Sequence, residues 1–210
     1  MKYKVMIVED QTMPRELFEL RIQASEHFEV ALSVDNAALA DVYCLRFPVD
    51  LILMDVVTRG GESGLDAAER IKRAFPQIII IIVTSMPECS YLSRAREIGV
   101  ESFWYKEEQR ESLLDVMERT MAGESVYPDA TPELQLGLAS SYEFTERELD
   151  VLREMTGGDT NQEIAERLHM SVATVKTHIF NMLEKTGFRN RTELAVRARE
   201  SGLVILNRKN

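Results

Sequence analysis

Five side chains suited to phosphoryl chemistry each follow a short apolar run. Glu9 and Asp10 follow a run near the N-terminus, Asp55 ends a central run, and Thr84 and Lys106 end two later runs. Short apolar runs of this kind are typical of strands buried on both faces of a sheet. In an open parallel sheet the carboxyl ends of the strands meet along one edge, where ligands bind. We therefore expect these five side chains to converge.

The chemistry of this set points to a metal and a phosphate. Three converging carboxylates repel one another unless a cation joins them, and oxygen ligands alone favour a hard ion such as Mg²⁺. A lysine ammonium attracts phosphate oxygens, a threonine hydroxyl donates to them, and a metal bridges carboxylate and phosphate. Polar residues are common at strand ends, so the interpretation depends on the coincidence at four different strands.

The segments that position these residues alternate between strand and helix. Strands are expected at 5–8, 28–33, 51–55, 78–83 and 102–105, and a helical pattern follows each one, the last running from Arg110 to Ala122. Parallel strands need crossover connections, which helices provide. The sequence therefore predicts an α/β doubly wound, five-stranded parallel sheet over residues 1–122.

Four strings in this region resemble the receiver domain of two-component response regulators, which has a flavodoxin-like fold. They are Val8-Glu9-Asp10, Leu53-Met54-Asp55, Val83-Thr84-Ser85 and Phe103-Trp104-Tyr105-Lys106.

The resemblance implies a role for each matching residue. Asp55 would accept a phosphoryl group from a sensor histidine kinase. Mg²⁺ would be held by Asp10, Asp55 and the backbone carbonyl of Val57, with Glu9 assisting. The phosphoryl-binding and switch residues would be Thr84, Lys106 and the aromatic Phe103.

The loop after Asp55 departs from the family pattern. Residues 56–64 lack the usual proline four positions after the aspartate and form a loop one residue longer than usual. Glu107 follows Lys106 where proline is frequent. Both departures bear on loop geometry and on the lifetime of the phosphorylated form.

Residues 123–141 break the alternation. Gly, Ser, Pro and Thr are frequent here, and we interpret the segment as an interdomain linker with a short helix around 133–138. From Phe144 onward the apolar spacing is helical, and Thr145 with Glu148 makes a capping box. The tight connection at His169-Met170 joins two helices into a helix-turn-helix, a motif that also occurs in plain helical bundles.

Four strings within the predicted all-α domain, residues 142–210, resemble the LuxR-type DNA-binding domain. They are Phe144-Thr145-Glu146-Arg147-Glu148, Asn161-Gln162-Glu163-Ile164-Ala165, Thr174-Val175-Lys176-Thr177-His178 and Arg191-Thr192-Glu193-Leu194. The whole chain thus resembles a NarL/FixJ-type response regulator. This implies that the helix 171–186 enters the major groove of double-stranded operator DNA. The expected DNA contacts are Thr174, Lys176, Thr177, Phe180, Lys185 and Arg191.

Phe180 has two open interpretations. An apolar side chain on the exposed face of this helix can contact a thymine methyl group in the major groove. Alternatively, its ring packs against the linker or the receiver in the inactive form.

Charge is unevenly distributed along this 210-residue chain of net charge −10. Residues 1–122 carry 14 basic and 21 acidic side chains, whereas residues 170–210 carry eight basic and three acidic ones. A basic stripe on an acidic protein suits a phosphate backbone, although it can equally be a solvated face. No apolar run approaches the ~18 residues that span a bilayer, and no signal-peptide pattern opens the chain. We therefore expect a cytoplasmic protein without a membrane partner.

These features predict a phosphorylation-regulated transcription factor that forms a homodimer when phosphorylated and is not an enzyme. One rival is a magnesium-dependent phosphatase of the haloacid dehalogenase type, but that type needs an aspartate two residues after the nucleophile, where this chain has Val57. Another is a receiver that acts as an interaction module without phosphorylation, which only the unusual loop favours.

Overall fold

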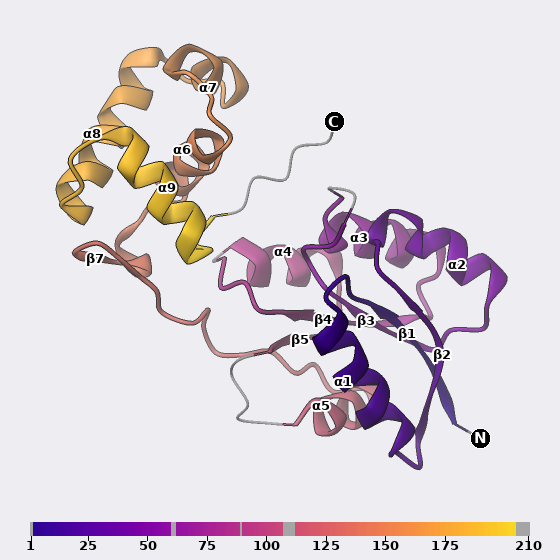
Figure 1. The fold of residues 1–210 in the computed structure, drawn as a ribbon. Coiled ribbons are helices and arrows are strands. Elements are labelled where there is room, and N and C mark those ends of the chain that lie inside the picture. Colours follow the sequence, from indigo (N-terminus) through magenta and orange to yellow (C-terminus); the bar gives the residue numbers. More distant parts are fainter. Residues whose placement is uncertain (1, 60–61, 89, 107–111, 205–210) are drawn as a thin grey trace. The chain divides into compact units, whose positions relative to one another are not determined.

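The computed structural model describes residues 2–59, 62–88, 90–106 and 112–204. Gly60, Gly61, Glu107, the first residues of the helix expected from Arg110, and residues 205–210 therefore lie outside the described residues. The chain divides into two compact units, with a boundary between Ala130 and Thr131. One unit is α/β and the other is largely helical (Figure 1).

The first unit contains the predicted parallel sheet. Its strands are β1 (Tyr3–Val8), β2 (Phe28–Val34), β3 (Leu51–Met54), β4 (Ile79–Thr84) and β5 (Ser102–Tyr105). Their order is β2-β1-β3-β4-β5, with every neighbouring pair parallel. This is the flavodoxin-like order, in which the switch point lies between β1 and β3. The predicted fold class is confirmed.

Helices cover both faces of this sheet. They are α1 (Thr12–Gln23), the 3₁₀ turn η1 (Ala37–Leu39), α2 (Ala40–Arg46), α3 (Gly64–Ala74), α4 (Ser90–Ile98) and α5 (Leu113–Met121). In Figure 1, α2, α3 and α4 lie above the sheet, and α1 and α5 lie below it. Alternate strand residues such as Ile7 and Leu53 pack with Phe18 of α1 and Met117 of α5 in one core. The helix expected over 36–47 is divided, because η1 precedes α2.

The second unit contains four helices among its described residues. They are α6 (Glu146–Thr156), α7 (Asn161–Arg167), α8 (Val172–Thr186) and α9 (Arg191–Ser201). A polar side chain caps the start of each one, and these caps are Thr145, Thr160, Ser171 and Asn190. Apolar side chains from all four helices pack into one core. The α7–α8 pair is the predicted helix-turn-helix, with His169 in its turn at φ 53°.

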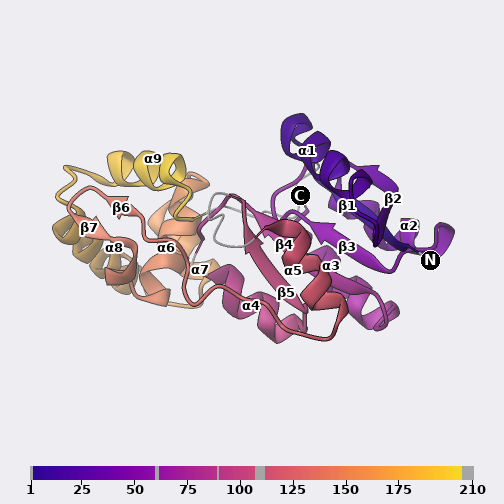
Figure 2. The same cartoon turned by 90° about the horizontal axis from the view of Figure 1, so that it is seen from below.

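The short helix predicted around 133–138 is wrong. Residues Gln135–Leu136 (β6) and Ala139–Ser140 (β7) instead form an antiparallel hairpin (Figure 2). Gly137 takes φ 64° at the first position of the two-residue turn, as a type II′ turn requires. Leu136 and Ala139 enter the core of the helical unit, so burial and turn geometry outweigh local helix propensity.

The predicted linker 123–141 contributes to both compact units. Val126 lies along the edge of β5, where its carbonyl accepts from Phe103 N–H at 2.9 Å and its N–H donates to Ser102 Oγ at 2.9 Å. Thr131 onward belongs with the helical unit. Within the described ranges, no helix combines the length and apolar character needed to cross a membrane.

Candidate functional site

The carboxyl ends of β1 and β3 bring Glu9, Asp10 and Asp55 together. Asp55 N–H donates to the carbonyl of Val8 at 2.9 Å, which places the residue after β3 beside the end of β1. One carboxylate oxygen of each acid lies within 4.8 Å of the others. Glu9 and Asp55 are buried, whereas Asp10 is partly exposed. The predicted convergence of these three acids is therefore present in the structure.

Lys106 reaches the same place from the end of β5. Its N–H donates to the carbonyl of Thr84 at 3.0 Å, which continues the β4–β5 pairing by one residue. Its Nζ lies 2.5 Å from Glu9 Oε2 and 2.8 Å from Asp55 Oδ2, and its side chain is 9% exposed. A single ammonium thus bridges the two buried carboxylates.

Burial and charge together set the protonation of this group. The pKa of Asp55 is raised to about 6, because desolvation and the charge of Glu9 raise it by more than Lys106 lowers it. Burial lowers the pKa of Lys106, but its two carboxylate partners outweigh this effect and leave its pKa raised. At neutral pH Asp55 is therefore mostly ionised and Lys106 remains a cation.

The donor set fits a hard divalent cation. Three carboxylates within 4.8 Å of one another offer oxygen ligands alone, which suits Mg²⁺ better than a softer metal. Lys106 supplies positive charge that the two buried carboxylates require.

The other predicted site residues are Thr84, Val57 and Phe103. Thr84 ends β4 and is fully buried. Val57 follows Asp55 by two residues, and its N–H lies 3.4 Å from Asp55 Oδ1. Phe103 on β5 is 1% exposed, and its ring lies between Tyr105 at 5.0 Å and Tyr127 at 6.3 Å.

The loop that follows Asp55 turns back tightly onto it. Val57 pairs with Ser63 in an antiparallel bridge, and Gly64 N–H donates to the carbonyl of Val56 at 2.8 Å. A Cβ at Gly64 would lie 1.9 Å from the Asp55 carbonyl oxygen, so this position requires glycine. The start of α3 is therefore pressed against the backbone of Asp55.

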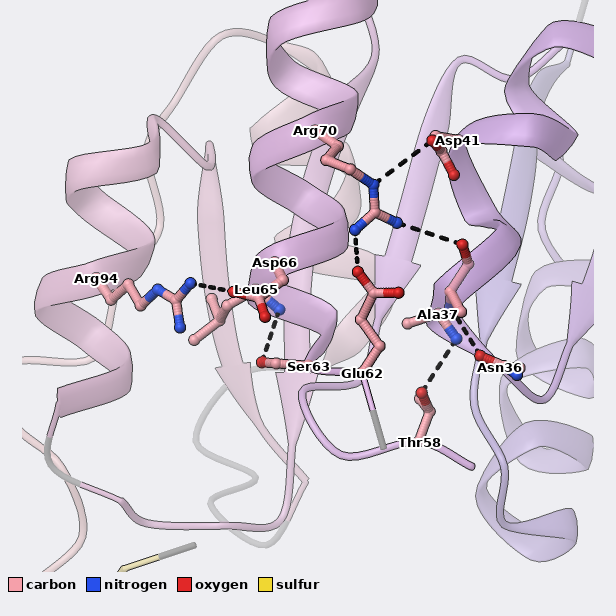
Figure 3. A network of polar contacts seen from close by, with 11 residues as sticks. Asn36, Ala37, Asp41, Thr58, Glu62, Ser63, Leu65, Asp66, Arg70 and Arg94 are labelled. Atoms are coloured by element: carbon pink, nitrogen blue, oxygen red, sulfur yellow. Dashed lines mark hydrogen bonds and ion pairs between the residues drawn. The ribbon is translucent and has the colours of Figure 1, made fainter. Parts of the chain in front are cut away.

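Polar contacts that no sequence motif indicates surround this loop (Figure 3). Arg70 of α3 contacts Glu62 of the loop and Asp41 of α2. Arginine on the polar face of a helix is common, so only the spatial arrangement reveals these partners.

A separate polar surface lies on α8 in the second unit. Thr174, Lys176, Thr177 and Phe180 are exposed, whereas Val175, Ile179 and Met182 are buried in the helical core. Phe180 remains 61% exposed although its ring is large and apolar. The face predicted to read DNA is thus separate from the packing face.

The two remaining predicted contacts already have partners within the helical unit. Lys185 Nζ lies 2.7 Å from both Glu148 Oε2 and the carbonyl of Glu143. Arg191 donates to Asn161 Oδ1 at 2.8 Å and to the carbonyl of Asp159 at 2.7 Å. Lys185 and Arg191 therefore support the domain itself, which their motif positions alone do not indicate.

Comparison with known proteins matches both units. Residues 5–118 match the response regulator receiver domain, and residues 143–198 match the bacterial regulatory proteins of the luxR family. The response regulator protein VraR of Staphylococcus epidermidis and that of Staphylococcus aureus are each 32% identical over 209 residues, which cover 97% of this chain and 100% of the relative.

Solved structures share the fold at lower sequence identity. RcsB from Salmonella enterica serovar Typhimurium, bound to the promoter P1flhDC in the presence of the phosphomimetic BeF₃⁻, has a TM-score of 0.62 at 20% identity, with 97% of this chain and 100% of RcsB covered. The response regulator ChrA of a heme-sensing two-component system has a TM-score of 0.52 at 21% identity, with 96% and 98% covered. The chain belongs to the NarL/FixJ-type response regulators, DNA-binding transcription regulators that join a receiver domain to a LuxR-type helix-turn-helix domain.

Proposed function

We propose that Asp55 is the phosphoacceptor through which a sensor histidine kinase controls DNA binding by this protein. The observation that carries the proposal is the position of Asp55, between the Glu9–Asp10 pair and the Lys106 ammonium. Among the described residues, no other group of three or more acidic, histidine or cysteine side chains has metal-ligand spacing. Asp55 therefore combines a nucleophilic oxygen with the charges that phosphoryl transfer requires.

Each side chain has a distinct task in the transfer. An ionised Asp55 oxygen attacks phosphorus as the phosphorus–nitrogen bond of the kinase phosphohistidine breaks, and the product is an acyl phosphate. Lys106 turns from the carboxylates to the incoming phosphoryl oxygens, and the Thr84 hydroxyl donates to another. When bound, Mg²⁺ neutralises charge on the phosphoryl oxygens. Asp10, Asp55 and the Val57 carbonyl would hold the ion, with Glu9 assisting.

Acetyl phosphate labelling tests the site directly. Wild-type protein should incorporate phosphate only with Mg²⁺, and Asp55→Asn should abolish incorporation. Asp50→Asn is the matched control, because Asp50 precedes β3 at its opposite end and accepts from Lys4 N–H at 2.8 Å. Normal labelling of Asp55→Asn would refute the site, and an unlabelled wild type would favour an interaction module without phosphorylation.

We infer that α8 enters the major groove of operator DNA. Its exposed threonines and Lys176 suit phosphates and base edges, and Phe180 offers an apolar surface to a thymine methyl group. Lys185 and Arg191 would reach phosphates while keeping their contacts within the domain. RcsB, a structural neighbour, has been seen bound to promoter DNA.

Phe180→Ala tests the apolar contact. If the ring reads one thymine, the variant should lose about 1–3 kcal/mol of discrimination at that base pair. The salt dependence of binding should not change, because no phosphate contact is lost, whereas Lys176→Ala is the comparison variant with a reduced salt slope. A site with uracil in place of thymine lacks only the methyl group. Equal binding of wild type to both sites would contradict base reading by Phe180.

Phosphorylation should promote a homodimer that binds two operator half-sites. A single recognition helix makes a small interface, whereas two-fold pairing doubles it. A structural neighbour, RcsB, is described as two dimers bound to two parallel DNAs. Sedimentation with and without acetyl phosphate measures the change, and an unchanged mass together with unchanged operator affinity would refute the switch. We further propose that the protein acts in the cytoplasm as a regulator, not as an enzyme.

A further inference from the structure

One guanidinium joins the loop after Asp55 to η1 and α2 of the receiver. Arg70 on α3 pairs through Nη1 with Glu62, lies 3.5 Å from Asp41 through Nε, and donates through Nη2 to the carbonyl of Ala38 at 3.3 Å (Figure 3). Glu62 belongs to the β3–α3 loop, whereas Ala38 and Asp41 belong to η1 and α2. All three acceptors thus lie outside α3.

A second contact holds the other side of the same loop. Thr58 Oγ1 accepts from Ala37 N–H at 3.0 Å, and Thr58 is 7% exposed. Ala37 is the first residue of the 3₁₀ turn η1, and the Asn36 side chain caps this turn. The backbone of Ala37 is therefore itself held in place. The loop is therefore attached to residues 37–41 at Thr58 and at Glu62, on both sides of Gly60–Gly61.

Both attachments follow the proposed metal ligand Val57 in the loop. Val57 directly precedes Thr58, and its N–H contacts Asp55 Oδ1. Longer loops carry more conformational freedom, and this loop also lacks the proline that would restrict its backbone. Contacts at Thr58 and Glu62 remove part of that freedom and so restrain the loop beside Val57.

We propose that Arg70 is a positioning residue for Mg²⁺: it clamps the β3–α3 loop to α2, and so holds the Val57 carbonyl ready for the metal. The proposal rests on the function proposed above for Asp55. Groups that orient metal ligands typically contribute about 10–100-fold to metal affinity. Because Arg70 acts through the loop instead of contacting a ligand directly, the lower end applies.

A second ion pair of α3 provides a control for the Arg70 substitution. Arg94 of α4 pairs with Asp66 of α3, with side chains that are 39% and 16% exposed, but this ion pair does not involve the loop. Arg70 and Glu62 are 37% and 23% exposed, so the two pairs are similarly placed with respect to solvent. Arg94→Ala therefore removes a comparable tertiary ion pair of α3 and leaves the loop attachments in place.

The experiment measures Mg²⁺ binding to the full chain by calorimetry, before any phosphorylation. Arg70→Ala should weaken Mg²⁺ binding about tenfold, Arg70→Lys should weaken it less, and Arg94→Ala should bind as wild type. Hydrogen exchange of the Thr58 and Glu62 amides in the metal-free protein should accelerate in Arg70→Ala alone. Acetyl phosphate labelling of Arg70→Ala should need more Mg²⁺ yet reach the wild-type rate at saturation.

Several results would overturn the clamp. These are unchanged Mg²⁺ affinity in Arg70→Ala, an equal loss in Arg94→Ala, or a labelling rate that stays low at saturating Mg²⁺. If Arg70→Ala does not fold, Arg70→Lys and Glu62→Gln carry the test, and wild-type affinity in both refutes the clamp. Failure of wild-type labelling would instead refute the role of Asp55, and the calorimetry would still decide whether Arg70 positions the metal site.

Discussion

Asp55→Asn should stabilise the metal-free receiver at neutral pH, although it removes the proposed phosphoacceptor. In the folded protein burial raises the pKa of Asp55 from 3.8 to about 6. Each pKa unit corresponds to about 1.4 kcal/mol, so an ionised Asp55 costs the folded state about 3 kcal/mol. Asparagine carries no charge and avoids this cost. Lys106 keeps its ion pair with Glu9 in the variant.

The sign of the pH dependence follows from proton binding. Folded Asp55 binds its proton more tightly than unfolded Asp55, so wild-type stability falls as the pH rises from 3.8 through about 6. The stability of the variant lacks this contribution. The advantage of Asp55→Asn should therefore be near zero at pH 4 and about 3 kcal/mol at pH 7.

Urea unfolding in the presence of a chelator measures this difference. Trp104, the only tryptophan of the chain, lies on β5 and is 7% exposed, so its fluorescence reports on the receiver. Added Mg²⁺ should reduce the advantage of the variant, because the ion binds and stabilises the wild type more strongly. Asp50→Asn should show no such gain.

Equal stability of Asp55→Asn and the wild type at pH 7 without metal would refute a desolvation cost at Asp55. A gain as large at pH 4 as at pH 7 would also refute it, since a gain without pH dependence would come from packing and not from the charge of Asp55.

Two further substitutions test the surrounding structure. Gly64→Ala should destabilise the receiver by about 3 kcal/mol, the upper end for overpacking, because the added Cβ would overlap the Asp55 carbonyl oxygen. A fluorescence-monitored unfolding midpoint equal to that of the wild type would contradict this. Lys185→Met should destabilise the helical unit by about 1–3 kcal/mol, since it leaves buried Glu148 without its cation. Backbone amides of α6 and α8 in the variant should then exchange hydrogen about tenfold faster or more than in the wild type. Unchanged exchange rates would show that Lys185 does not stabilise the helical unit.

The amino-acid sequence by itself determined the sheet and which residues lie at its carboxyl edge. Apolar runs such as 51–54 are typical of strands buried on both faces of a parallel sheet, and each is followed by a helical segment that makes the crossover. The residue after each strand must then lie at the carboxyl edge. For this reason Asp55 and Lys106 could be assigned to one site although 51 residues separate them.

Local signals also located the helices of the second unit. Side-chain caps such as Thr145 and Ser171 act through backbone groups only a few residues away, so they can be recognised without tertiary structure. The hairpin at 135–140 gives no such signal. Its two-residue strands form because Leu136 and Ala139 fill a core built from distant helices.

Only the tertiary structure decided the partners of Arg70 and Lys185. Nothing near Arg70 in the sequence predicts that it contacts Glu62, Asp41 and the carbonyl of Ala38. Lys185 is a predicted DNA contact, yet it pairs with Glu148, 37 residues away in the chain. Ion pairs depend on where long, flexible side chains meet after the backbone has folded, and residue spacing along the sequence does not carry that information.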